Sequence, residues 1–410
     1  MTPLDVAVIG CGTAGAAAAL LLARAGHRLT VYERVAEPGP VGAGISLQPT
    51  GQAVLARLGL LAPILARAAR IDRLHVVRRA GRTLVDLRYA DVDPRWFGLG
   101  LHRGTLFVTL YDAVRAEPGV TVHTGAAITE LRRDATGVTA LGPDGPRGRH
   151  ELVVVADGAI SELHASAGVP VTSRAFGFGA LWFVADDPGP SFRDELHQVV
   201  DGARRMYGIL PTGCGPSDDR PLVSLYWSLE VAAYPRWRAA GLAAWKAEVL
   251  RFDPRCAPVL DQIVDLDQVV LARYRDVRMR RWHGDRVVFL GDAAHATSPQ
   301  LGNGANLALV DAAVLADALA DHGALPEALA AYSRARRHHL RHYQRMSRLL
   351  TPLFQSNSRL LGGLRDRLMP LADRLGPMHR LMVRTMAGHE RGLFLRRPLD
   401  HRALARLPGR

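Results

Sequence analysis

The sequence has 410 residues, of which 48% are hydrophobic and 22% are charged. This composition is typical of a folded globular protein, excludes a largely disordered chain, and allows two sizeable hydrophobic cores. The formal net charge of +13 comes almost entirely from arginine, because Lys246 is the only lysine among 52 basic residues.

The N-terminal segment predicts a dinucleotide-binding turn. Residues 6–9 form a continuous apolar run, as expected of a parallel strand buried on both faces. The glycine motif GCGTAG follows at residues 10–15, and a helix is predicted over residues 16–25. Glycines at this spacing allow a tight turn and close approach of a pyrophosphate. A second strand, residues 28–32, ends in Glu33, whose carboxylate can accept hydrogen bonds from ribose hydroxyls.

The middle of the chain predicts a β-rich region. Residues 73–87 read as a hairpin that turns at Ala80 and Gly81. Further along, a helix is predicted over residues 237–250, after four strands at residues 178–184, 195–200, 205–210 and 222–229. This region is separate from the glycine motif and predicts a second sheet.

The segment at residues 287–311, VVFLGDAAHATSPQLGNGANLALVD, predicts a flavin site. A short apolar strand runs into Gly291 and Asp292, and an aspartate there presents acceptor oxygens to a hydroxyl-rich ligand. Gly302 and Gly304 let the backbone approach a flat ring, and the start of the next helix favours an anion. Ribitol hydroxyls, a flat ring and a negative charge on that ring describe a reduced flavin.

After about residue 346 the pattern is helical, with apolar residues and arginines interleaved. Three uses remain open for these helices: packing on the body of the protein, a homodimer face, or a membrane surface. Pro352, Pro370 and Pro377 favour short helices and therefore packing.

The cysteines, the hydropathy and the basic residues indicate the expected cellular location and binding partners. Cys11, Cys214 and Cys256 lack metal-ligand spacing, which favours a reducing, cytoplasmic location. No apolar run is long enough for a transmembrane helix, and the N-terminus reads as the first strand instead of a cleavable signal. The basic cluster at residues 334–345 lacks interleaved aromatic stacking platforms, so no nucleic-acid partner is expected. His338 and His342 in this cluster are four residues apart and could ligate a metal, but no third ligand is evident, and no metal site is expected.

With a third segment, these motifs resemble the class A FAD-dependent aromatic monooxygenases, the family built like para-hydroxybenzoate hydroxylase. The third segment is VVVADGAISELH at residues 153–164, where Asp157 and Gly158 match the second fingerprint of the family. Ser161 matches as well, but His164 stands where the family has an arginine that serves FAD and the nicotinamide cofactor. The resemblance covers roughly residues 1–350.

The resemblance implies an α/β fold: a discontinuous Rossmann-type FAD-binding domain, a β-sheet-rich substrate domain, and C-terminal helices. We expect the FAD-binding domain at residues 1–70, 96–165 and 281–350, the substrate domain at 71–95 and 166–280, and the C-terminal helical segment at 351–410. Motif matches, including the loop around Gly44 and an arginine that opens a helix, give these expected FAD contacts: Gly10, Gly12, Ala14, Gly15, Glu33, Arg34, Gly44, Arg103, Asp157, Gly291, Asp292, Pro299, Gly302, Gly304, Ala305 and Asn306.

The activity implied is hydroxylation of a phenolic or polycyclic aromatic small molecule with O₂. In the family, NADH or NADPH reduces FAD, and the reduced flavin traps O₂ as a C4a-hydroperoxide that transfers oxygen to the ring. The loop from Pro299 to Asn306 is expected to hold the flavin anion, although helix capping is the alternative role for Asn306. No catalytic side chain is assigned. Candidate substrate contacts on the predicted strands are His75, Arg205, Tyr207 and Tyr226.

Two other functions remain open. One is a non-oxygenating flavin-dependent reductase of a prenyl or quinone compound, which His164 in place of arginine keeps under consideration. The other is a flavin-binding protein without turnover. The sequence does not identify the substrate, the choice of NADH or NADPH, or the oligomeric state.

Overall fold

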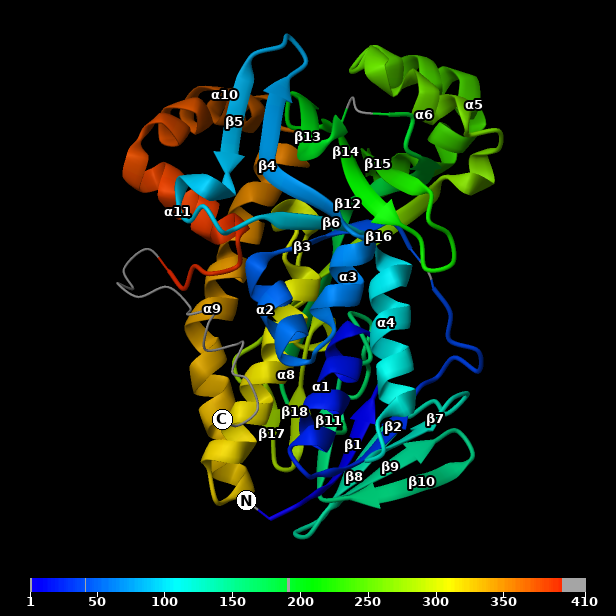
Figure 1. Cartoon of the computed structure of the whole chain (residues 1–410), viewed down its shortest axis with the longest axis vertical. Helices are drawn as coiled ribbons and strands as arrows, with labels where there is room; N and C mark the ends of the chain where they lie inside the picture. The colour runs from blue at the N-terminus through cyan, green and yellow to red at the C-terminus, as the bar shows by residue number, and fades with distance from the viewer. Residues whose placement is uncertain (1, 41, 190–191, 393–410) are drawn as a thin grey trace.

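A mostly parallel six-stranded sheet lies at one end of the protein (Figure 1). The structure is a computed structural model that describes residues 2–40, 42–189 and 192–392. The strand order is β17-β18-β11-β1-β2-β7, and the central strand β1 pairs in parallel with both β2 and β11. In chain order the strands are β1 (Asp5–Ile9), β2 (Arg28–Tyr32), β7 (Val120–His123), β11 (Leu152–Val155), β17 (His283–Gly284) and β18 (Val287–Phe289).

Helices cover this sheet and bring the two glycine-containing motifs together. The helix after the first motif, α1 (Thr13–Arg24), packs against α8 (Gly304–Asp321), which follows the last motif. Residues 14–22 of α1 are all buried, because its alanines let α8 approach closely. The other helices in this half are α2 (Pro49–Arg57), α3 (Leu61–Arg67), α4 (Arg103–Ala116) and α7 (Asp292–His295).

A small antiparallel sheet, which the sequence analysis did not predict, lies beside the six-stranded sheet. Its strands are β8 (Glu130–Arg133), β9 (Val138–Gly142) and β10 (Gly145–His150).

The second large sheet has nine strands and lies at the opposite end of the molecule (Figure 1). The order is β16-β12-β15-β14-β13-β4-β6-β3, with β5 paired to β4. The bounds are β3 (Gly44–Leu47), β4 (Ala69–Arg78), β5 (Thr83–Arg88), β6 (Gly98–His102), β12 (Val171–Asp186), β13 (Asp194–Asp201), β14 (Arg205–Cys214), β15 (Pro221–Glu230) and β16 (Val270–Met279).

The predicted hairpin and all four predicted strands are present in this sheet, each at least as long as expected. The domain limits remain a prediction, but β3 and β6 pair within the nine-stranded sheet although they fall in the segments assigned to the FAD-binding domain. The predicted helix at residues 237–250 begins earlier, as α5 (Tyr234–Leu250), and is interrupted at Gly241, which has a φ of +84°.

The two faces of the nine-stranded sheet are covered differently. On the outer face, α5 and α6 (Ala257–Asp261) enclose an aromatic cluster that contains Tyr207, Trp227 and Trp245. On the inner face, Tyr226 and Phe354 pack with residues of the C-terminal helices. These helices are α9 (Leu325–Phe354), α10 (Arg359–Arg374) and α11 (Gly376–Met386). Elsewhere in the chain, short 3₁₀ helices are η1 (Tyr89–Asp91), η3 (Val231–Ala233), η4 (Pro254–Cys256), η5 (Leu266–Gln268) and η6 (Pro299–Leu301).

The C-terminal helices differ from the expectation that prolines would divide them. Pro352 and Pro370 lie inside α9 and α10, near their ends, and only Pro377 begins a helix. The inner face of the sheet is covered by α9 and α11, whereas α10 exposes leucines three or four residues apart: Leu360, Leu364, Leu368, Leu371 and, at its end, Leu375. Residues 393–410 of the predicted segment lie outside the described residues. None of the helices in the described ranges is long and apolar enough to cross a membrane.

Helix α9 is more buried than a solvated basic helix would be. Arg336, His339 and His342 are buried, although Arg337 and His338 on the same helix are exposed. The basic cluster at residues 334–345 therefore contributes to the interior as well as to the surface.

A buried carboxylate joins α8 and α9 to the loop after β18. Asp311 is 0% exposed, and its Oδ1 accepts a hydrogen bond of 2.7 Å from Arg336 Nε. Its Oδ2 accepts from Gly291 N at 2.9 Å and from His295 Nε2 at 2.5 Å. Burial alone would raise the pKa of Asp311, but His295 and Arg336 outweigh burial and lower this pKa to about 2.

We predict that Asp311→Asn lowers the free energy of unfolding by about 3–5 kcal/mol at pH 7, because it leaves the buried Arg336 without its counter-charge. The lowered pKa means that the Asp311 contribution is present above its ordinary pKa of 3.8 and is lost as the pH falls towards 2. Urea unfolding of the wild type and the variant between pH 7 and pH 2 measures both effects.

Asp321→Asn is the matched control, because Asp321 is exposed at the end of the same helix. Equal unfolding free energies for the two variants at pH 7 would show that Asp311 does not hold α8 and α9 together.

Candidate active site

The three sequence motifs meet at the carboxyl ends of the parallel strands β1, β11 and β18. Gly10 has a φ of +92°, and a Cβ atom there would lie 2.7 Å from Ala156 O and 3.0 Å from Asp157 Cα. Gly291 has a φ of +59°, and a Cβ atom there would lie 2.9 Å from the Cβ of Ala14. Both glycines are required because each allows one motif to touch another. Segments about 150 and about 280 residues apart in sequence thus form one site.

The first glycine motif leaves open space at the start of α1. No described atom lies within 4 Å of a Cβ atom built on Gly12, whereas one built on Gly15 would overlap the backbone of Gly10. Gly12 is the N-cap of α1 and provides no side-chain hydrogen bond to the free N–H groups of the first turn. Open space at a helix N-terminus with free N–H groups fits a pyrophosphate.

Glu33 holds the loop that follows β1. Its Oε2 accepts a 2.8 Å hydrogen bond from Cys11 N, and its Oε1 accepts a 2.9 Å bond from Val35 N. A carboxylate has further lone pairs, so Glu33 can shape this loop and still accept from a ribose hydroxyl. Burial, with a smaller contribution from Glu33, raises the pKa of Cys11 to about 12, as expected of a packed thiol. Arg34 is exposed beside Glu33.

Asp157 follows β11 and has one carboxylate oxygen without a partner. Its Oδ1 is buried and has no hydrogen-bond partner among the residues that the structure describes. Burial raises the pKa of Asp157, although Ser161 opposes this shift. A buried acceptor without a partner is costly unless a ligand satisfies it, and this atom therefore fits a bound group with N–H or O–H donors.

His164, at the arginine position of the second fingerprint, faces the interior. Its Nε2 donates a 2.7 Å hydrogen bond to Ala293 O, since a carbonyl oxygen can only accept. Its ring stacks on Phe289, with 4.6 Å between ring centroids and 7° between ring planes. His164 thus fastens the second motif to the third and does not reach the surface where an arginine could contact a nicotinamide cofactor.

The third motif borders an accessible surface. Asp292, the first residue of α7, is exposed, and its Oδ1 lies 4.0 Å from a Cβ atom built on Gly304 at the start of α8. Pro299, at the start of η6, is also exposed, and Gly302 has a φ of +60°. Asp292 can therefore accept from ligand hydroxyls next to the N–H groups that begin α8.

Asn306 is a connecting residue and not the cap of α8, which is Asn303. The Oδ1 of Asn306 accepts a 2.7 Å bond from Gln48 N, and its Nδ2 donates to Ser46 O at 3.0 Å. The amide thus ties β3 and its following turn to the helix start, while the neighbouring Ala305 is half-buried. Because both ends of the amide are used within the protein, Asn306 shapes the loop through its side chain.

Strand β3 and the loop before it bring the nine-stranded sheet next to the third motif. Gly42 has a φ of +113° and packs against the side chain of Arg103, which begins α4. Gly44 N donates a 2.8 Å bond to Ser224 Oγ on the inner face of β15. Ser46, on β3, lies beside Gly302. The inner face of the nine-stranded sheet is therefore the face directed towards the three motifs.

Only one of the four predicted substrate residues lies on this inner face. Tyr226 is two positions from Ser224 on β15 and therefore shares its face. His75, Arg205 and Tyr207 project from the outer face: Tyr207 packs in the aromatic cluster, Arg205 pairs with Glu248 of α5, and His75 shares the face of Val77, which packs against that cluster. Strand alternation decides the orientation, and a strand pattern alone does not reveal which face meets a ligand.

Tyr226 belongs to an aromatic group on the inner face. Its ring centroid is 5.4 Å from that of Trp182, whose indole N–H donates to Tyr274 Oη at 3.2 Å. Tyr226 is 8% exposed, and burial raises the pKa of its hydroxyl. This aromatic group, with the buried Tyr226 hydroxyl, lies near Ser224, which bonds the start of β3.

Several residues that shape the site were not predicted. Gln48, Asn303 and Ser224 act through contacts with segments far away in sequence, which leave no local pattern. The sequence indicates the role of Asp311 only weakly: an acidic residue among the alanines and leucines of an otherwise apolar helix predicts a buried partner.

Comparisons with known proteins agree with this geometry. Residues 3–347 match the protein family described as FAD binding domain. The 3-amino-4-hydroxybenzoate 2-monooxygenase of Streptomyces platensis is 32% identical over 386 residues, which cover 90% of this chain and 93% of that protein. The 6-methylpretetramide 4-monooxygenase of Streptomyces rimosus is 28% identical over 417 residues, covering 96% of this chain and 94% of that protein.

A solved structure of a probable FAD-dependent monooxygenase from Pseudomonas aeruginosa is also similar. It superimposes with a TM-score of 0.76 at 26% identity, covering 88% of this chain and all of that one. The family match spans most of the chain, and the relatives named above are all monooxygenases. The chain therefore belongs to the class A FAD-dependent aromatic monooxygenases, with FAD as its cofactor.

Proposed function

We propose that this protein hydroxylates a small aromatic molecule that carries an activating hydroxyl or amino group, with NADH or NADPH as reductant. The observation that carries this proposal is the meeting of three motifs beside the inner face of the nine-stranded sheet. The relatives support the substrate class, since one is named for an aminohydroxybenzoate and another for 6-methylpretetramide. The reductase alternative is not retained, because these relatives are oxygenases.

Within the proposed site, different residues would bind different parts of FAD. The open turn at Gly12 and the N–H groups of α1 would bind the pyrophosphate, Glu33 the ribose, and Asp292 the ribitol hydroxyls. The start of α8 at Gly304 would stabilise negative charge on the flavin ring. When bound, FAD supplies the redox and oxygen chemistry.

The substrate is proposed to lie against the inner face of the nine-stranded sheet. Support comes from Tyr226 and Trp182, which offer aromatic surface there, and from the closing of this face by α9 and α11. Such closure excludes water from the reacting ring. His164 is buried, so we propose that the nicotinamide contact made by an arginine in relatives is supplied by other residues here.

Two further expectations remain proposals. The free thiols of Cys11, Cys214 and Cys256 support a reducing, cytoplasmic compartment. The exposed leucines of α10 support a homodimer, since their spacing of three or four residues is typical of a helix-packing face.

We predict that Asp292→Ala greatly weakens FAD binding without unfolding the protein, because the exposed carboxylate has little structural role. The ratio of flavin to protein absorbance after purification measures the loss. Asp321→Ala, at the exposed far end of α8, is the control and should retain full flavin. A fully yellow Asp292→Ala protein would contradict the role assigned to this carboxylate.

The function itself is tested by isotope transfer. The enzyme is incubated with NADH or NADPH, ¹⁸O₂ and a panel of phenolic and aminobenzoic acids, and products are analysed by mass spectrometry. We expect at least one compound of the panel to give a hydroxylated product that contains one ¹⁸O atom. Oxidation of the nicotinamide without any labelled product across the panel would contradict the proposed substrate class.

Two tyrosines, one on each face of the nine-stranded sheet, test on which face the substrate lies. Tyr226→Phe should lower kcat/KM about 5- to 10-fold, the cost of a lost hydrogen bond of about 1 kcal/mol. Tyr207→Phe, a buried tyrosine on the adjacent strand that faces outward, should leave kcat/KM unchanged. Equal effects of the two substitutions would exclude a substrate position on the inner face near Tyr226.

A further inference from the structure

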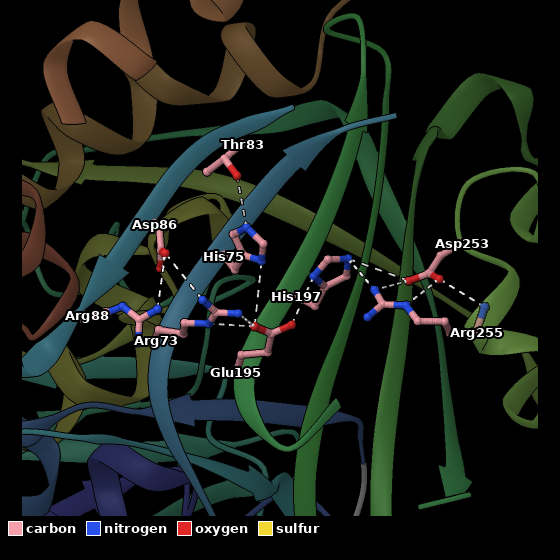
Figure 2. Close-up of polar contacts among 9 residues, drawn as sticks. All are labelled: Arg73, His75, Thr83, Asp86, Arg88, Glu195, His197, Asp253 and Arg255. Carbon is pink, nitrogen blue, oxygen red and sulfur yellow. Dashed lines mark hydrogen bonds and ion pairs between the residues drawn. The ribbon is translucent and has the colours of Figure 1, made fainter. Parts of the chain in front are cut away.

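A group of histidines and charged residues lies on the outer face of the nine-stranded sheet (Figure 2). His75 belongs to β4, whereas Glu195 and His197 belong to β13. The two strands are parallel, and His75 and His197 are register partners, so their side chains project from the same face. Residues about 120 positions apart in sequence are thereby brought together.

Three potential metal-ligating atoms converge in this group. His75 Nδ1 lies 3.8 Å from Glu195 Oε2, and His197 Nδ1 lies 3.3 Å from Glu195 Oε1. One ligand atom from each of the three residues fits within a mutual distance of 4.8 Å. Both Nδ1 atoms are buried and lack a hydrogen-bond partner within the described part of the chain. The imidazole rings are adjacent, with centroids 5.6 Å apart.

Burial and neighbouring charges act on this group in different directions. Burial lowers the pKa of His75, although Glu195 opposes this shift. For Glu195, burial raises the pKa, but the neighbouring His197 and Arg73 outweigh burial and lower the pKa to about 2. His197 Nε2 is 2.9 Å from an Arg255 nitrogen, whereas its Nδ1 faces Glu195.

We propose that His75, Glu195 and His197 bind a divalent transition-metal ion, with Zn²⁺ as the ion that best matches the donor set. Two imidazoles and one carboxylate are a common set of three protein ligands for zinc, with water as the fourth. Solvent can supply this water, because the side chain of His75 is 20% exposed. The arginines Arg73 and Arg255 line the same group and set a limit on the affinity.

Partners for the outer nitrogens of both imidazoles are present. His75 Nε2 lies 3.4 Å from Thr83 Oγ1, and His197 Nε2 lies 3.7 Å from the buried carboxylate of Asp253. On binding the ion through Nδ1, His197 would shift its proton to Nε2 and donate it to Asp253. A carboxylate behind a ligating histidine orients the ring and strengthens the ligand.

Arg255 is the group that competes with the ion. Its guanidinium donates to both Asp253 and His197 Nε2, and the side chain is 45% exposed and free to turn away. Removing Arg255 frees Asp253 for His197 and removes a positive charge from the site. Arg255→Ala should therefore tighten metal binding, whereas removal of a ligand should weaken it.

We expect the bound ion to hold together two groups of strands in the nine-stranded sheet. β4 carries β5 and β6, β13 carries β14, and the β4–β13 pair is the join between these groups of strands. An ion held by both strands stabilises the folded state by the free energy with which it binds. We expect Zn²⁺ to raise the unfolding temperature whether or not a substrate is present.

The test uses the purified flavin-loaded protein without a histidine tag, after dialysis against a chelator. Zn²⁺ is titrated by calorimetry, and Co²⁺ is used as a spectroscopic probe, because its absorption bands report nitrogen ligation. The variants are His75→Ala, Glu195→Gln and Arg255→Ala. His338→Ala is the control for non-specific binding, since His338 is exposed on α9. Flavin absorbance confirms that each variant is folded.

We expect one Zn²⁺ per chain in the wild type and in His338→Ala, and binding at least about 100-fold weaker in His75→Ala and Glu195→Gln. Arg255→Ala should bind Zn²⁺ about 10-fold more tightly. If Zn²⁺ binding is absent, or is unchanged by both ligand substitutions, the group is an ion-pair network without a metal and the proposal is wrong.

Discussion

The carboxylate of Asp311 is shared by three elements that must meet before a flavin can be held. It accepts hydrogen bonds from Gly291, from His295 and from Arg336, and so fixes the loop after β18 against α8 and α9. A buried carboxylate needs such partners, because an uncompensated charge in the interior is strongly unfavourable. The position of Asp292, directly after Gly291, follows from this arrangement.

Glycines, in addition to the ion pairs of Asp311, bring the three motifs together. Gly10 and Gly291 allow the first motif to touch the second and the third, while Gly12 leaves space where α1 begins. The third motif meets the nine-stranded sheet where Gly302 lies beside Ser46 of β3, and Gly44 of the same strand donates to Ser224 on the inner face. Together these contacts place the flavin motifs on the side of the sheet that carries Tyr226, whereas the group around Glu195 lies on the other side.

Much of this architecture could be predicted from local patterns. The glycine motif, the strand that ends in Glu33, the hairpin and the four strands of the second sheet all have signatures within a few residues. Orientation could not be predicted, because one position along a strand moves a side chain to the opposite face. For this reason His75, Arg205 and Tyr207 were expected near the flavin motifs but lie on the outer face. The three-residue group around Glu195 left no signal either, since its members come from strands about 120 residues apart.

The most direct test of oxygen transfer is rapid mixing of the chemically reduced, FAD-loaded protein with oxygenated buffer, followed by flavin absorbance with and without phenolic acids. The account predicts a transient spectrum that differs from those of reduced and oxidised flavin and that depends on an aromatic ligand. Direct return to oxidised flavin under every condition would contradict oxygen transfer to an aromatic substrate in this site.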